Sequence, residues 1–177
     1  HEYRLKLYPE VYGDAYERFR EILAGTKAVY LENEMAAFWK NGLQVLIYGF
    51  EMKREYYDRF CRQQLPVTEL TDVFGTPPKE AFSILLAHHP WYTEAYDCFG
   101  ADVTLSGHYH GGVVGFGNRG LVSPDFRLFP KNCHGCCEKD GHYRIVSAGC
   151  GEHTIPVRLH NPRELVVLEI DGSGEGK

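Results

Sequence analysis

Two short apolar runs that end abruptly in histidine constrain the fold of this chain more than any other feature. Residues 84–87 lead into His88-His89-Pro90, and residues 105–107 lead into His108-Tyr109-His110. A buried strand that delivers imidazoles at its C-terminal end is typical of metal sites in α/β proteins, because the sheet fixes the ligands while the loop leaves room for substrate. The two segments therefore predict an α/β fold with histidine ligands at one edge of a sheet.

The spacing within the second segment predicts how its side chains point. His108 and His110 stand two residues apart, so on an extended segment they point the same way. Tyr109 lies between them and is expected to point the opposite way and pack. The flanking glycines keep bulk away, so that backbone or an anionic ligand can come close.

The order of these motifs resembles a known family. H-x-P, a spacer and then S-G-H-x-H-G-G resembles the C-terminal half of the calcineurin-like metallophosphoesterases, and within them the bacterial branch of small phosphodiesterase-like proteins. The resemblance covers most of residues 26–170 and continues through residues 121–124, 129–131, 146–151 and 156–165.

The resemblance also implies that part of the family pattern is missing. The family carries D-x-H and G-D-x-x-D blocks, which are absent here, and a G-N-H-[DE] block, of which His1-Glu2 looks like the second half. Asp140-Gly141-His142 spells D-x-H, but it precedes an expected strand, whereas the family's block follows one. Residues 1–177 are therefore expected to be the C-terminal portion of a four-layer α/β/β/α sandwich, with a disordered tail at 172–177. One sheet face would need covering by an upstream half of the same protein, and that half would carry the missing blocks.

The resemblance assigns roles to four histidines. His88 and His108 would ligate one metal ion, His110 would ligate the other, and His1 would be the catalytic proton donor or orienting group. The activity implied is hydrolysis of phosphodiesters or phosphomonoesters by two divalent ions (Mn, Fe, Zn or Ni) with a metal-bridging hydroxide. His89 has no counterpart in the motif and is expected to face solvent or to lie behind the ligands.

Two other functions stay open. The first is a catalytically inactive protein-binding scaffold on the same fold. The second is a zinc or redox module centred on residues 133–137, which Cys150 could join in space. A structural zinc site usually has a second cysteine pair at matching spacing, and none is present. These cysteines are therefore interpreted as reduced thiols of a cytoplasmic protein, in a turn before a strand.

Length and net charge limit the number of domains and the kinds of binding partner to expect. A chain of 177 residues suits one domain, and its net charge of −5 gives no electrostatic footprint for nucleic acid. No apolar run approaches the roughly 20 residues of a membrane span, so no transmembrane segment is expected in this chain. A membrane anchor upstream of this chain is left as an open alternative. Arg158 is interpreted as a structural ion-pair residue, with phosphate binding as the alternative.

Secondary-structure signals divide the chain into alternating helices and strands. Asp14 and Gly25 are expected to cap a helix, and Asn41-Gly42 predicts a hairpin. Strands are expected at residues 28–39, 43–48, 82–87, 102–106, 143–147 and 165–170. Helical segments are expected at residues 54–63 and around 91–98, a loop or short broken helix at 66–78, and a long irregular loop at 111–141.

Overall fold

The computed structural model describes residues 3–57, 63–112, 114–116, 119–122, 132–151 and 158–170. The chain divides into two compact units, His1–Leu31 and Glu32–Lys177.

The first unit is helical. Its helices are α1 (Tyr3–Leu7), α2 (Pro9–Tyr12) and α3 (Ala15–Ala24). Helix α3 lies where the capping signals predict it, but the Asp14 side chain makes no capping hydrogen bond and instead forms an ion pair with Arg18 at 2.8 Å. Tyr16, Phe19 and Leu23 are half-buried along one side of α3 and give the helix an apolar face.

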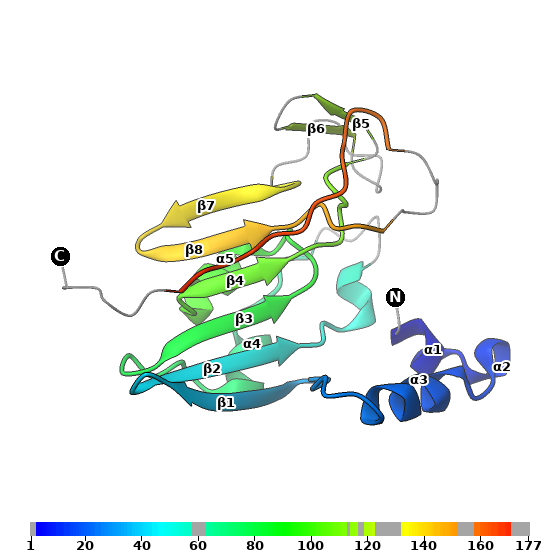
Figure 1. Cartoon of the computed structure of the whole chain (residues 1–177), viewed down its shortest axis with the longest axis horizontal. Coiled ribbons are helices and arrows are strands. Elements are labelled where there is room, and N and C mark those ends of the chain that lie inside the picture. Colours follow the sequence, from blue (N-terminus) through cyan, green and yellow to red (C-terminus); the bar gives the residue numbers. More distant parts are fainter. Residues whose placement is uncertain are drawn as a thin grey trace. The chain divides into compact units, whose positions relative to one another are not determined.

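The second unit is built on a six-stranded mixed sheet (Figure 1). In spatial order its strands are β1 (Glu34–Lys40), β2 (Leu43–Phe50), β3 (Phe82–Ala87), β4 (Val103–Ser106), β8 (His142–Val146) and β7 (Gly135–Lys139). The inner strands β2, β3, β4 and β8 are parallel, and the edge strands β1 and β7 are antiparallel to their neighbours. The predicted α/β class is therefore confirmed.

Short helices and one separate hairpin complete the second unit. They are the 3₁₀ helix η1 (Arg54–Tyr57), α4 (Thr68–Phe74), α5 (Thr93–Phe99), and the antiparallel pair β5 (Val114–Phe116) and β6 (Arg119–Val122). Asn41 and Gly42 both have positive φ, 51° and 80°, between β1 and β2. Two such residues match the twist of a tight hairpin, so the predicted Asn-Gly turn is confirmed.

The main core lies between one face of the sheet and the helices α4 and α5, which both lie behind the sheet in Figure 1. Tyr48 of β2 and Leu85 of β3 project into it, and Leu70 and Phe99 come from the helices. The rings of Tyr48 and Phe99 meet edge to face at 5.3 Å, a favoured aromatic geometry. Burial of these large side chains fixes the helices on this face.

The opposite face of the sheet carries apolar side chains of very different exposure. Ile84 and Val103 are buried, but Leu86, on the central strand β3, is 38% exposed. Phe38 and Tyr143, on strands β1 and β8, are each 47% exposed. A central strand normally has both faces covered in a parallel sheet, so this face has room for a further packing layer.

Three predicted elements differ from the structure. Residues 165–170 form no strand, and Leu165 and Val167 are 83% and 85% exposed, so the predicted closing strand is wrong. The predicted loop at 111–141 contains β7, a polar edge strand without apolar alternation. The predicted strand at 28–39 begins only at Glu34.

Two further points concern the helices. Of the predicted helical segment at 54–63, residues 54–57 form η1, and residues 58–62 lie outside the described residues. Among the helices that the structure describes, none is both long enough and apolar enough to span a bilayer.

Candidate functional site

The two histidine segments meet because their strands are parallel neighbours. Leu86 of β3 pairs with Leu105 of β4, so the carboxyl ends of both strands lie at one edge of the sheet. The N–H of Gly107 donates to the carbonyl oxygen of His88 at 3.0 Å and joins the two loops. The ring centroids of His88 and His108 lie 5.3 Å apart, with an interplanar angle of 81°.

The segment from His108 to Gly112 is a tight left-handed turn, not an extended one. His108 and His110 have φ of 64° and 49°, and the following glycines have φ of 73° and 92°. The expectation of an extended segment, on which His108 and His110 would point the same way, is therefore wrong in its backbone conformation. Tyr109 between them is fully buried, which agrees with its predicted packing role. Non-glycine residues with positive φ each store about 1–3 kcal/mol and cluster at functional sites.

His89 is buried against His108. It is 7% exposed, and its ring stacks on that of His108 with centroids 4.3 Å apart and planes 30° apart. The expectation that it faces solvent is wrong, and the alternative, that it lies behind a ligand, agrees with this position. The N–H of Trp91 donates to its Nδ1 at 3.3 Å, and the Tyr96 hydroxyl donates to its carbonyl oxygen at 2.9 Å. Burial raises the pKa of Tyr96, so that hydroxyl keeps its proton.

Three tyrosines complete an aromatic cluster around His108. The Tyr57 ring lies 5.8 Å from both His89 and His108, and the Tyr92 ring lies 5.5 Å from His89. The Tyr109 ring lies 5.4 Å from His89 and 5.5 Å from His108. We call Tyr57, His89, Tyr92 and Tyr109 the aromatic cluster. Sequence reasoning missed its role, although the His88-His89 doublet was a visible signal.

His110 is oriented by the loop that follows β8. Its Nδ1 lies 3.2 Å from the carbonyl oxygen of Gly151. A proton on Nδ1 would make this a hydrogen bond and place the lone pair on Nε2. Metal-binding histidines commonly donate their second ring nitrogen to a backbone carbonyl in this way.

Arg158 holds the same loop. Its guanidinium donates to the carbonyl oxygens of Ala148 and Gly151, each at 2.6 Å, and to that of Pro162 at 3.1 Å. These acceptors are backbone carbonyls and not carboxylates, so the expectation of an ion pair is wrong. Arg158 acts structurally in this loop.

Asn161 joins the end of the chain to the histidine turn. It is 9% exposed, and its amide donates to the carbonyl oxygens of His110 at 2.5 Å and Gly112 at 2.6 Å. A Cβ on Gly111 would lie 2.6 Å from Asn161 Oδ1, so only glycine fits there. Sequence reasoning did not single out Asn161, which lies in the resembling stretch 156–165.

The separation of the His88 and His108 rings is compatible with both imidazoles binding one metal ion. Two imidazoles on one tetrahedral ion place their ring centroids roughly 5 Å apart, given metal–nitrogen bonds of about 2.1 Å, and the observed separation is 5.3 Å. Within the described ranges, however, no group of three or more His, Cys, Asp or Glu side chains is arranged to hold a metal ion. A complete site would need further donors.

The other histidines are not part of this pair or lie outside the described residues. His1 and His153 lie outside the described residues. His142 lies at the start of β8, with its Nδ1 3.0 Å from the carbonyl oxygen of Ala101. His134 precedes β7, and His160 adjoins Asn161.

The cysteines form no metal cluster in the part of the chain that the structure describes. Cys133 is buried, whereas Cys136, Cys137 and Cys150 are exposed. Cys136 and Cys137 lie within strand β7, so the predicted turn location is wrong. Cys61 lies outside the described residues.

Comparison with known proteins gives one informative relative. Over 108 residues the chain is 33% identical to a protein of Aquifex aeolicus (strain VF5) named "Uncharacterized metallophosphoesterase". The alignment covers 60% of this chain and 40% of that protein, so the chain spans less than half of the relative's length. No protein-family model and no solved structure matches the chain. The relationship to metallophosphoesterases that the histidine segments predict is therefore confirmed.

Proposed function

We propose that the protein containing this chain hydrolyses phosphoesters, either phosphodiesters or phosphomonoesters, at a dinuclear metal centre. The observation that carries the proposal is the 5.3 Å approach of His88 and His108 at the carboxyl ends of adjacent parallel strands. The name of the Aquifex aeolicus relative supports the same reaction class.

The histidines of this chain would hold the ions. His88 and His108 would bind one ion and His110 the other, with its Nδ1 directed at the Gly151 carbonyl. Neutral imidazoles suit Mn, Fe, Zn or Ni and leave the positive charge of the site intact. When bound, two divalent ions would neutralise the phosphoryl oxygens and make a water acidic near neutral pH.

Other residues of the chain would orient the metal ligands, admit the substrate and protonate the leaving oxygen. The aromatic cluster keeps the His108 ring in one orientation, and the glycines after His110 let an anionic substrate approach the backbone. His1 would donate a proton to the leaving oxygen or orient it, a role that the resemblance implies.

An upstream segment of the same protein would complete the site and the fold. The chain has no G-D-x-x-D, and its one D-x-H, Asp140-Gly141-His142, opens strand β8 where the family's block would follow a strand. The relative is more than twice as long as the aligned region. The exposed Leu86, Phe38 and Tyr143 offer that segment an apolar sheet face. A second sheet packed there would give the four-layer α/β/β/α sandwich.

Variants of the full-length protein test the reaction. His108→Ala and His110→Ala should each lower metal stoichiometry, and hydrolysis of an aryl phosphodiester should fall by orders of magnitude. His1→Ala should keep the metal and slow turnover by about 10²–10⁴, less for a good leaving group such as p-nitrophenolate. His142→Ala, at the opposite edge of the sheet, is the matched control and should change neither quantity.

Two results would contradict the proposal. If His108→Ala retained full metal content and rate, the histidine site would be wrong. If the full-length protein hydrolysed no phosphoester with Mn, Fe, Zn or Ni, the protein-binding scaffold would be the better description.

A further inference from the structure

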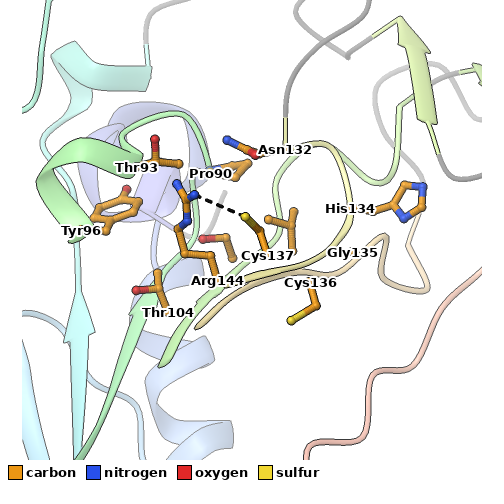
Figure 2. Close-up of a pocket in the computed structure, with 12 residues that line it drawn as sticks. Pro90, Thr93, Tyr96, Thr104, Asn132, His134, Gly135, Cys136, Cys137 and Arg144 are labelled. Carbon is orange, nitrogen blue, oxygen red and sulfur yellow. Dashed lines mark hydrogen bonds between the residues drawn. The ribbon is translucent and has the colours of Figure 1, made fainter. Parts of the chain in front are cut away.

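A small cavity lies on the helix-facing side of the sheet, between α5 and the strands β4, β8 and β7 (Figure 2). Its volume is about 50 Å³. Its polar lining includes Thr93, Thr104, Asn132, Cys137 and Arg144. None of the histidines assigned to the metal site lines it, so the cavity is separate from that site.

Three of its polar residues form a row across neighbouring strands. Arg144 of β8 pairs with Thr104 of β4 on one side and with Cys137 of β7 on the other. Paired residues of adjacent strands lie on the same face of a sheet, with the strands about 4.8 Å apart. The same row continues through Leu85 and Tyr48 into the apolar core. The sheet therefore changes from apolar to polar where it meets the cavity.

Arg144 is the buried cation beside the cavity, and it shares its carboxylate partner. Arg144 Nε lies 3.5 Å from Asp97 Oδ1, and Lys139 Nζ lies 3.1 Å from Asp97 Oδ2. Arg144 and Asp97 are only 16% and 17% exposed, whereas Lys139 is 54% exposed. Arg144 lines the cavity, and Asp97 does not.

The buried guanidinium of Arg144 points to a missing ligand. Its Nε is buried and makes no hydrogen bond to any described residue. The only acceptor of its Nη2 in the described ranges is the Cys137 sulfur at 3.6 Å, which is a weak acceptor. Thr104 is 4% exposed and lines the same cavity. A buried polar group without a partner costs about 1–3 kcal/mol, so a polar occupant would stabilise the protein.

We propose that this cavity is a binding site for a small oxyanion, held by Arg144 and Thr104 beside the Cys137 thiol. The Arg144 guanidinium in the lining, whose Nη2 has only a weak sulfur acceptor in the described ranges, favours an anion over water. A water molecule needs about 10–15 Å³ by this measure, so the cavity of about 50 Å³ suits the oxygens of a phosphate, sulfate or carboxylate group. Ligands of drug size occupy about 300–1,000 Å³, so only an anionic head group would enter.

Alkylation of Cys137 reports on the anion site. Iodoacetate and iodoacetamide react in the same way: the thiol sulfur forms a bond to carbon, iodide leaves, and the thiol proton goes to solvent. The two reagents differ in charge, so an anion site beside Cys137 should favour iodoacetate. Cys136 is the comparison: it is also exposed and also lines the cavity, but its side chain points away from Arg144 in Figure 2.

The experiment uses the full-length protein and measures the initial alkylation rate of each cysteine by peptide mass spectrometry. The ratio of the iodoacetate rate to the iodoacetamide rate should be about tenfold higher at Cys137 than at Cys136. Inorganic phosphate should lower the ratio at Cys137 more than sodium chloride does at equal ionic strength. Arg144→Gln should bring the ratios at the two cysteines together.

Two further variants keep the test decisive if Arg144→Gln fails to fold. Thr104→Val preserves the side-chain shape and should weaken protection by phosphate. Arg144→Lys keeps the charge but loses the planar fork and should retain only part of the preference for iodoacetate. Equal ratios at Cys136 and Cys137 in the wild-type protein, or equal effects of phosphate and chloride, would overturn the proposal.

Discussion

Replacing His89 by alanine should weaken the site without touching a proposed ligand. The substitution removes a 7% exposed ring that stacks on His108 at 4.3 Å and meets the rings of Tyr57, Tyr92 and Tyr109. Truncation of a buried aromatic side chain costs about 3–5 kcal/mol, and the polar imidazole places His89→Ala near the lower end, at about 3 kcal/mol. For a domain of this size that corresponds to a fall in Tm of about 6–12 °C.

The effect on metal binding follows from lost orientation. With its stacking partner gone, the His108 imidazole can rotate, and supporting residues of metal ligands typically contribute about 10–100-fold in affinity. Titration calorimetry of the metal-free full-length protein measures that affinity. NMR signals of the His108 ring in the metal-free state measure its orientation independently of any activity.

Matched variants separate stacking from general destabilisation. His89→Phe keeps a flat ring against His108 but loses the acceptor for the Trp91 N–H, so it should retain most of the metal affinity. His142→Ala also removes an imidazole, but at the opposite edge of the sheet. If His89→Ala left both the metal affinity and the His108 signals unchanged, the positioning role would be wrong.

Two other predictions concern the glycine turn and the open sheet face. Gly111→Ala should destabilise the protein by about 3–4 kcal/mol, because the new Cβ meets Asn161 at 2.6 Å as well as a φ of 73°; Gly100→Ala, with a φ of 81° and open space, should show only about 1–2 kcal/mol. Chemical denaturation of both variants checks this, and equal losses would contradict it. Adding the upstream segment to residues 1–177 should slow amide hydrogen exchange around Leu86, and unchanged exchange would refute the covering layer.

The strands that carry the site could be predicted from sequence because their signal is strong and local. Residues 82–87 are apolar except for Ser83, and the observed strand β3 has the same bounds. The strand predicted before His108, at residues 102–106, agrees with β4 (Val103–Ser106) to within one residue. Because β3 and β4 are parallel neighbours, their carboxyl ends lie at the same edge of the sheet, and His88 and His108 follow those ends.

The conformation of the loops could not be predicted in the same way. Strand periodicity was applied to His108 and His110, but both have positive φ because the glycines and Asn161 stabilise a left-handed turn. That stabilisation comes from a residue about fifty positions away in the chain. The burial of His89 likewise depends on Tyr57 and Tyr92, which a local pattern does not show.

The pattern of polar and apolar residues gave wrong strand predictions at residues 135–139 and 165–170. Strand β7 carries cysteine, glutamate and lysine and lacks apolar alternation, yet it pairs with β8 along its whole length. Residues 165–170 carry the opposite pattern, rich in leucine and valine, and pair with no described strand. Backbone pairing at an edge needs a partner in register more than it needs burial.

The strain in the histidine turn argues for its function. His108 and His110 together store about 2–6 kcal/mol of unfavourable backbone energy, which a structural turn would avoid by placing glycine at both positions. The surroundings offset this strain with specific contacts, including the Asn161 amide, the Gly151 carbonyl and the stacked ring of His89. A strained pair of imidazoles so closely supported is explained if the rings themselves are needed at that edge, which is what ligation of metal ions requires.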